Sequence, residues 1–151
     1  MSGPYRERLH VPLRWWVQGV MFIVTVWIAV ILWVPAPLAW TITGVIVALF
    51  ALAMHSYGSI TIEVRDGWLY AGKARIQTGF LGECRALTAE EAWQVAGPQA
   101  DARAYLLLRP YVRRAVKVQI QDPADRTPYW LIASRHPDQL AAALTAANAS
   151  H

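Results

Sequence analysis

The stretch from Val17 to Met54 contains no charged side chain, and it constrains the fold of this 151-residue chain more than any other feature. As a helix, Val17–Val34 would span roughly 27 Å, close to the ~30 Å hydrocarbon core of a bilayer. Pro35–Pro37 then interrupts the helix, because proline lacks the backbone N–H and clashes with the preceding turn. The sequence therefore predicts a transmembrane hairpin over residues 17–57, with membrane-spanning helices at 17–34 and 38–55.

The charges that flank the hairpin predict its orientation. The N-terminal arm, residues 1–16, carries Arg6, Arg8 and Arg14, whereas the hairpin tip at Pro35–Pro37 carries no charge. Because Lys and Arg are enriched on the cytoplasmic side of membrane helices, both termini are expected in the cytoplasm. A cleaved signal peptide is the rival interpretation of the first helix. However, its apolar run exceeds the usual length of about 7–15 residues, and a second span follows at once.

Residues 58–151 have a different character, because charged and apolar residues alternate there as in a water-soluble fold. The period is two in Ile60–Arg65 and in Ala115–Gln121, which is typical of strands with one buried face. Further strands are predicted at Trp68–Ala71, Ala74–Gln77, Gly82–Leu87, Ala104–Arg109 and Tyr129–Ala133. The chain after the hairpin is therefore expected to form a cytoplasmic, β-rich domain.

Two helices are predicted within this domain. Thr88–Glu91 matches a capping box, which predicts a short helix that ends at Gly97. Pro137 suits the first position of a helix, and a C-terminal helix is predicted over residues 137–147. The predicted fold class is a membrane α-helical hairpin followed by a small antiparallel barrel or roll, with this helix over one opening. The element order resembles a pleckstrin-homology-like (PH-like) fold, an analogy that does not fix function.

Several strings of residues, distributed over nearly the whole chain, carry a family resemblance. They are Tyr5-Arg6-Glu7-Arg8-Leu9, Pro12, Trp15-Trp16, Ala104-Tyr105-Leu106, Arg109-Pro110, Val116-Lys117-Val118, Asp122-Pro123, Pro128-Tyr129-Trp130 and Arg135-His136-Pro137. Together they resemble DUF3093, a family of small actinobacterial membrane proteins. The resemblance implies a multi-pass protein of the bacterial plasma membrane with two spans. It implies no particular activity.

Small residues line one face of the second predicted span. Thr41, Gly44, Ala48 and Ala51 follow one another at three- and four-residue steps, so they share a side of the helix. Small side chains let helix backbones approach closely, and in lipid such packing drives association. This face is expected either to pack against the first helix of the same chain or to pair chains into a homo-oligomer.

The densest group of basic residues lies in the β-rich domain and consists of Arg109, Arg113, Arg114 and Lys117. It is interpreted either as a contact for anionic lipid head groups or a protein partner, or as a solvated loop. Near an anionic surface each basic residue is worth about 1 kcal/mol. The formal net charge of +4 and the absence of a basic stripe give no indication of nucleic-acid binding.

No group of residues in the sequence predicts a catalytic site, a cofactor or a metal. The four histidines lack metal-ligand spacing, and Cys84, the only cysteine, cannot form an intrachain disulfide. Asp122 and Asp125 lie in a segment typical of a turn, where carboxylates bond the nearby backbone.

The leading hypothesis is a membrane-anchored binding or scaffold protein whose β domain engages a membrane component or a protein partner. The alternative is a membrane-bound enzyme, or enzyme subunit, that acts on a lipid-linked or cell-envelope substrate. A deep polar pocket with perturbed titratable groups would favour the enzyme. A basic face or an exposed strand edge would favour the binding protein.

Overall fold

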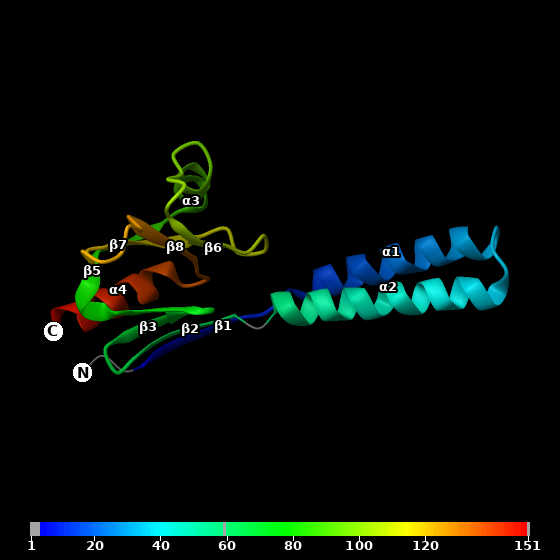
Figure 1. Ribbon diagram of the computed structural model, residues 1–151, viewed down its shortest axis with the longest axis horizontal. Coiled ribbons are helices and arrows are strands. Elements are labelled where there is room, and N and C mark those ends of the chain that lie inside the picture. Colours follow the sequence, from blue (N-terminus) through cyan, green and yellow to red (C-terminus); the bar gives the residue numbers. More distant parts are fainter. Residues whose placement is uncertain (1–3, 59, 151) are drawn as a thin grey trace. The chain divides into compact units, whose positions relative to one another are not determined.

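A computed structural model describes residues 4–58 and 60–150 (Figure 1). The chain divides into two compact units. One unit is the apolar helical hairpin. The other is a β domain, which is assembled from the chain before the hairpin and the chain after it. The predicted order of two long apolar helices, a β-rich region and a C-terminal helix is confirmed.

The hairpin consists of α1 (Leu13–Ile31) and α2 (Ala36–Tyr57), and both helices are long and apolar enough to cross a membrane. Helix α1 lies a few residues earlier than predicted. It starts directly after the extended Pro12, and its last turn closes when Trp33 N and Val34 N both donate to Val30 O, at 3.1 and 3.0 Å. Within the hairpin, Trp16 meets Phe50 edge to face at a centroid distance of 5.8 Å.

Almost no side chain of the hairpin is buried. Helix α1 has no buried residue, and Ala39 is the one buried residue of α2. Large apolar side chains lie open along both helices; Phe22 and Leu52, for example, are each 67% exposed.

The first sheet of the β domain has the strand order β1-β2-β3-β4, and all its neighbouring strands are antiparallel. Its strands are β1 (Tyr5–Leu9), β2 (Ile60–Arg65), β3 (Trp68–Ala71) and β4 (Ala74–Gln77). Strand β1 falls in the segment that the sequence analysis assigned to an N-terminal arm, and it pairs with β2 from Tyr5↔Val64 to Leu9↔Ile60. This strand was not predicted, because one of its two buried residues is the charged Glu7, so polar and apolar residues do not alternate along it.

The second sheet has the order β5-β7-β8-β6. Its strands are β5 (Leu81–Leu87), β6 (Tyr105–Leu107), β7 (Ala115–Ile120) and β8 (Tyr129–Ala133). The expectation of a wholly antiparallel barrel or roll is wrong here, because β6 pairs in parallel with β8. Strands β5 and β8 already occupy both edges of β7, so β6 joins the sheet on the far side of β8.

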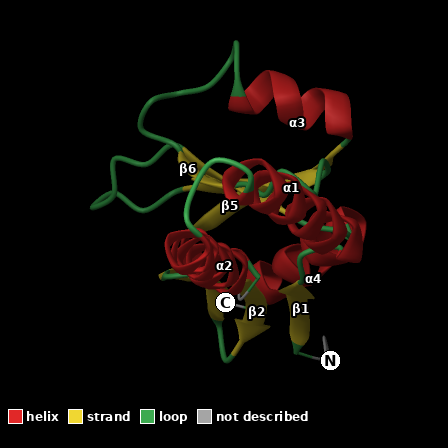
Figure 2. Ribbon diagram, turned by 90° about the vertical axis from the view of Figure 1, so that its right-hand side faces the viewer, coloured by secondary structure: helices red, strands yellow, loops and turns green. Residues whose placement is uncertain are grey.

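The remaining elements are a 3-10 turn η1 (Thr78–Phe80), helix α3 (Ala89–Ala96) and the C-terminal helix α4 (Pro137–Ala149). Helix α4 packs against β5 and β7 of the second sheet and also contacts β2 of the first, so it lies between the sheets (Figure 1). It extends past the predicted residue 147, because Asn148 Nδ2 donates to Leu81 O at 2.9 Å and holds its last turn. Helices α3 and α4 lie on opposite faces of the second sheet (Figure 2).

Two apolar clusters hold the β domain together. The larger one fills the space between the sheets, and its fully buried members include Leu9, Ile62, Leu69, Val116, Ile132, Leu140 and Leu144. The smaller one lies under α3 and contains Leu87, Ala92, Ala115, Tyr129 and Leu131. Strand β7 contributes to both clusters, because successive side chains point to opposite faces of a sheet.

Candidate ligand-binding site

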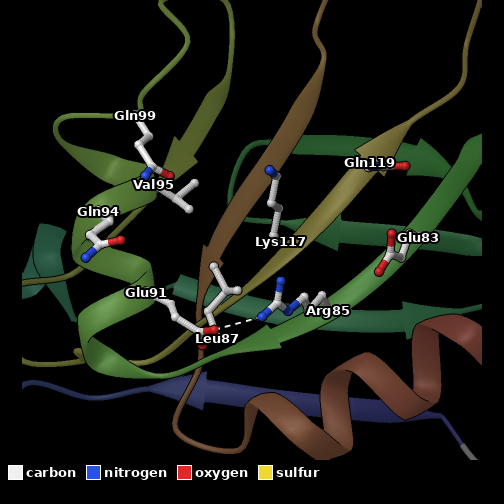
Figure 3. Close-up of a pocket in the computed structure, with 9 residues that line it drawn as sticks. All are labelled: Glu83, Arg85, Leu87, Glu91, Gln94, Val95, Gln99, Lys117 and Gln119. Carbon is white, nitrogen blue, oxygen red and sulfur yellow. Dashed lines mark hydrogen bonds and ion pairs between the residues drawn. The ribbon is translucent and has the colours of Figure 1, made fainter.

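A polar cavity of about 320 Å³ lies between α3 and the outer face of the second sheet (Figure 3). Strands β5 and β7 form its floor, and α3 with the segment that follows it forms its wall. Its lining residues are Glu83, Arg85, Leu87, Glu91, Gln94, Val95, Gln99, Lys117 and Gln119.

Local sequence fixes the position of the cavity wall. The predicted capping box is present, since Glu91 N donates to Thr88 Oγ1 at 3.3 Å and Thr88 N donates to Glu91 Oε2 at 2.9 Å. These bonds satisfy N–H groups at the start of α3 that have no partner within the helix. Ala92 then packs on Leu87 and Ala115, which holds the helix on the sheet.

The charged groups of the cavity are balanced, with two carboxylates and two basic side chains. Arg85 Nη2 bonds Glu91 Oε1 at 2.8 Å. The pKa of Glu91 is lowered mainly by the hydrogen bond from the Thr88 backbone, with smaller contributions from the Thr88 side chain and Arg85. Lys117 Nζ lies 4.5 Å from the ring centroid of Tyr129, and the Lys117 side chain points into the cavity (Figure 3).

Three carboxamides, on Gln94, Gln99 and Gln119, complete the polar lining. Each carboxamide offers both donors and acceptors. Together with the balanced charges, this donor set suits an uncharged or zwitterionic polar ligand better than an ion. Sequence reasoning missed the cavity, because its residues come from two strands, a helix and a loop that no single motif links.

The basic cluster predicted from the sequence is divided by the fold. Lys117 faces the cavity, whereas Arg109, Arg113 and Arg114 lie in the segment between β6 and β7. Arg113 and Arg114 are exposed, and within the described part of the chain no carboxylate pairs with either of them. Arg109 is half-buried and its Nη1 donates to Leu108 O at 3.2 Å.

Glu7 is the centre of a buried polar cluster that sequence reasoning also missed. Its Oε2 accepts from Ser134 Oγ at 2.6 Å and from Tyr5 Oη at 2.9 Å, and its Oε1 accepts from Arg135 N at 2.8 Å. His136 Nδ1 lies 3.9 Å from Glu7 Oε1. Burial is the main reason that the pKa of Tyr5 rises to about 12. The cluster joins β1 to the segment between β8 and α4.

The Glu7 cluster contains the residue types of a hydrolase triad but not its geometry. A serine nucleophile needs a base that accepts its proton and a path to substrate. Ser134 is fully buried, its hydroxyl donates to the carboxylate, and it accepts from the backbone N of His136 at 3.0 Å. The cluster is therefore a structural connection between distant parts of the chain.

The small-residue face of α2 is exposed and does not meet α1. Thr41, Gly44, Ala48 and Ala51 are all exposed, and a Cβ at Gly44 would meet no atom within 4 Å. The contact between the helices uses other residues, since Phe50 packs where a Cβ at Gly19 would collide with its ring. Of the two expectations for this face, packing within the chain is therefore not seen.

The other polar residues singled out from the sequence have local roles. Asp122 Oδ1 accepts from Ala124 N and Asp125 Oδ1 accepts from Thr127 N, each at 2.9 Å, as expected of turn carboxylates. Cys84 is half-buried, and burial raises the pKa of its thiol to about 11. Within residues 4–58 and 60–150, no three His, Cys, Asp or Glu side chains gather as metal ligands do.

Comparison with known proteins agrees with the resemblance seen in the sequence. The model of the family described as "Protein of unknown function (DUF3093)" matches residues 4–144. The chain belongs to the DUF3093 family. No curated protein and no solved structure gives a significant match.

The DUF3093 match covers both units of the chain. It includes β1 as well as the hairpin, and it extends through the β domain to Leu144 in α4. The cavity and the Glu7 cluster therefore both lie within the region that defines the DUF3093 family.

Proposed function

We propose that this protein is a membrane-anchored binding protein, in which the hairpin spans a bacterial plasma membrane and the β domain binds a polar ligand in the cytoplasm. The exposed apolar surface of α1 and α2 is the observation that carries the proposal. Soluble monomers seldom expose apolar patches larger than a few hundred Å². Lipid would cover these side chains, and a helix satisfies its own backbone hydrogen bonds in the bilayer.

The orientation of the anchor remains as predicted from charge. Arg6 and Arg8 precede α1 and Arg14 lies in its first turn, while the tip between the helices has no charged residue. These charges favour both termini on the cytoplasmic side. The PH-like character of the β domain also stays a prediction, and it is supported by the order of strands followed by a C-terminal helix.

Introduced cysteines test the anchor and its orientation together. In whole cells, a membrane-impermeant maleimide is expected to label Ala36→Cys, in the hairpin tip, but not Ser2→Cys or Ser150→Cys until the cells are lysed. Cys84→Ala should serve as the background. Labelling of both termini from outside would contradict the orientation. Release of the protein from membranes by alkaline carbonate would contradict the anchor itself.

For the cavity, we propose a small uncharged or zwitterionic ligand, such as an amino acid, a dipeptide or a sugar. The cavity is lined by the Arg85–Glu91 ion pair and by Glu83 and Lys117, so its lining offers no net charge to a simple ion. A membrane-bound enzyme remains the alternative function, and in that case the polar cavity would be its substrate site. The pKa of Glu91, which lines the cavity, is lowered mainly by its capping bonds and does not by itself indicate catalysis.

Thermal unfolding of the full chain in mild detergent, with a panel of these three compound classes, tests the cavity. A ligand at 100 times its Kd should stabilise the protein by about 2.7 kcal/mol. Gln119→Leu should abolish the effect, whereas Gln77→Leu, on the first sheet, should preserve it. If no class raises the Tm, or if Gln119→Leu responds as the wild type does, the cavity does not bind this kind of ligand.

A further inference from the structure

The chain enters and leaves the hairpin at one end of the first sheet. Strand β1 ends at Leu9, shortly before α1 begins at Leu13, and α2 ends at Tyr57, shortly before β2 begins at Ile60. Leu9 and Ile60 are paired. We call this the junction end of the β domain. Because a residue spans at most about 3.6 Å, these links keep the junction end within about 15 Å of the helix termini, whatever the relative placement of the units.

Contacts within the β domain bring two more segments to the junction end. The turn between β3 and β4 lies there, because Gly72 N donates to Thr61 O at 3.3 Å. The end of β6 lies beside this turn, since a Cβ at Gly72 would come within 3.3 Å of Leu107 Cδ1. The segment between β6 and β7, residues 108–114, therefore starts at the junction end.

The same segment is tied to β1 at its other side. Arg114 O accepts from Ser134 N at 3.1 Å, and Ser134 Oγ donates to Glu7 at 2.6 Å. Glu7 is followed by Arg8, and the Arg8–Thr61 pair of β1 and β2 lies beside the Leu9–Ile60 pair at the junction end. Two independent sets of contacts thus place the basic segment at the junction end.

Basic residues from four parts of the sequence meet at this end. They are Arg8, Lys73, Arg109, Arg113, Arg114 and Arg135. All except the half-buried Arg109 are exposed. In the part of the chain that the structure describes, no carboxylate pairs with Lys73, Arg113 or Arg114. Glu7, which adjoins Arg8, is buried and engaged by its own cluster, whereas Asp138, in the first turn of α4, is exposed.

At the opposite end of the β domain, acidic side chains outnumber basic ones. There Arg65 bonds Asp66 at 3.2 Å and lies 3.8 Å from Glu63, on the turn between β2 and β3. Arg126 lies in the loop between β7 and β8 together with Asp122 and Asp125. The charges named at the junction end are therefore net positive, whereas those named at the opposite end are net negative.

We propose that the junction end docks on anionic phospholipid head groups of the membrane that holds the hairpin. This inference rests on the proposed membrane anchor. Each exposed basic residue near an anionic surface contributes about a fivefold gain in affinity. The anchor holds the charges at a high effective concentration near the lipid, so a few of them suffice to orient the domain.

Energy transfer in proteoliposomes tests the proposal with the full chain. A donor fluorophore on Pro110→Cys, in the Cys84→Ala background, reports transfer to a trace of head-group-labelled acceptor lipid. Vesicles contain phosphatidylcholine alone or an equal mixture with phosphatidylglycerol. Transfer should be higher in the mixed vesicles, and the difference should vanish when the Debye length falls from about 10 Å in 0.1 M salt to about 3 Å in 1 M salt.

Matched double variants separate the two ends. Arg113→Gln with Arg114→Gln should lower the ratio of docked to undocked domains about thirtyfold. Arg65→Gln with Arg126→Gln, which removes the same charge from the opposite end, should leave it unchanged. Equal transfer in both kinds of vesicle, or equal effects of both variants, would overturn the proposal. Failure of the protein to float with the vesicles would instead overturn the anchor.

Discussion

The hairpin and the β domain use apolar side chains in opposite ways. In the β domain, large residues such as Leu140 are fully buried between two sheets. In the hairpin, residues of the same type, such as Leu52, are 67% exposed. A core that excludes water stabilises the first unit, whereas the apolar side chains of the second unit have no such core of their own. This difference is what the proposed membrane anchor requires, with the hairpin in lipid and the β domain in water.

Truncation of one leucine in each unit should give the largest contrast. Leu140→Ala leaves a cavity in the core of the β domain and should lower its free energy of unfolding by about 2–5 kcal/mol. Leu52→Ala removes a side chain that packs against no core and should change the same quantity by less than about 0.5 kcal/mol. Hydrogen exchange of the strand amides in detergent measures both. Equal effects of the two variants would show that the β domain depends on the hairpin surface.

The buried carboxylate of Glu7 should have the next largest effect. Glu7→Ala removes the acceptor of bonds from Ser134 and Arg135 N in a buried site, at a cost of about 3 kcal/mol. The matched control is Glu63→Ala on the neighbouring strand, whose carboxylate lies 3.8 Å from the exposed Arg65 in a pair worth less than about 1 kcal/mol. The same exchange experiment compares them. If both variants are equally mild, Glu7 does not hold β1 to the rest of the domain.

The role of β1 also marks the limit of sequence reasoning. The strands after the hairpin were predicted from alternation, turn signals and apolar runs, and the helices from Pro137 and the capping box at Thr88. Strand β1 was not, because its inward positions include Glu7 and because its partner, β2, follows only after the whole hairpin. A domain expressed from residue 60 onward would lack this strand and the Glu7 cluster.

Side-chain direction explains why the predicted site was only partly right. Lys117 was grouped with Arg113 and Arg114 because it is close in sequence. As a strand residue between the buried Val116 and Val118, however, it points to the α3 face and enters the cavity. The basic segment itself was found from composition. Its position beside Gly72 and Glu7 depends on contacts between the sheets, which no local pattern records.

A large side chain introduced at Gly19 should weaken the packing of α1 on α2, whereas one introduced at Gly44 should not. Gly19→Leu would collide with Phe50 and should weaken the packing of α1 on α2 by about 1–3 kcal/mol. Gly44→Leu meets open space in the same chain and should leave that packing intact. Cysteine pairs across the helices, crosslinked in detergent, measure the contact. Similar losses of crosslinking in both variants would show that the small-residue face also packs within the chain.

Self-association through the exposed face of α2 can be tested with the same variants. If the chain forms a homo-oligomer there, Gly44→Leu with Ala48→Leu should abolish crosslinks between chains in membranes. Val45→Leu, on a neighbouring exposed position, should preserve them. Dimers that survive the double variant would require another interface.

The smallest expected effect concerns Cys84, which belongs to the β domain and should react slowly with aqueous thiol reagents. Burial raises the pKa of its thiol from 9.0 to about 11, so near pH 8 the reactive thiolate is about a hundredfold scarcer than for an ordinary thiol. A raised pKa means that the folded protein holds this proton more tightly than the unfolded chain does. The associated stability is therefore complete below about pH 9 and is lost as the pH rises toward 11.

Alkylation rates across this pH range measure the effect, with Ala36→Cys in the hairpin tip as the internal standard. The rate at Cys84 should keep rising up to about pH 11, whereas the rate at the tip should level off near pH 9. If Cys84 reacts as fast as the tip near pH 8, the thiol is not enclosed between β5 and the core. That outcome would remove one of the observations that set the buried interior of the β domain apart from the open surface of the hairpin.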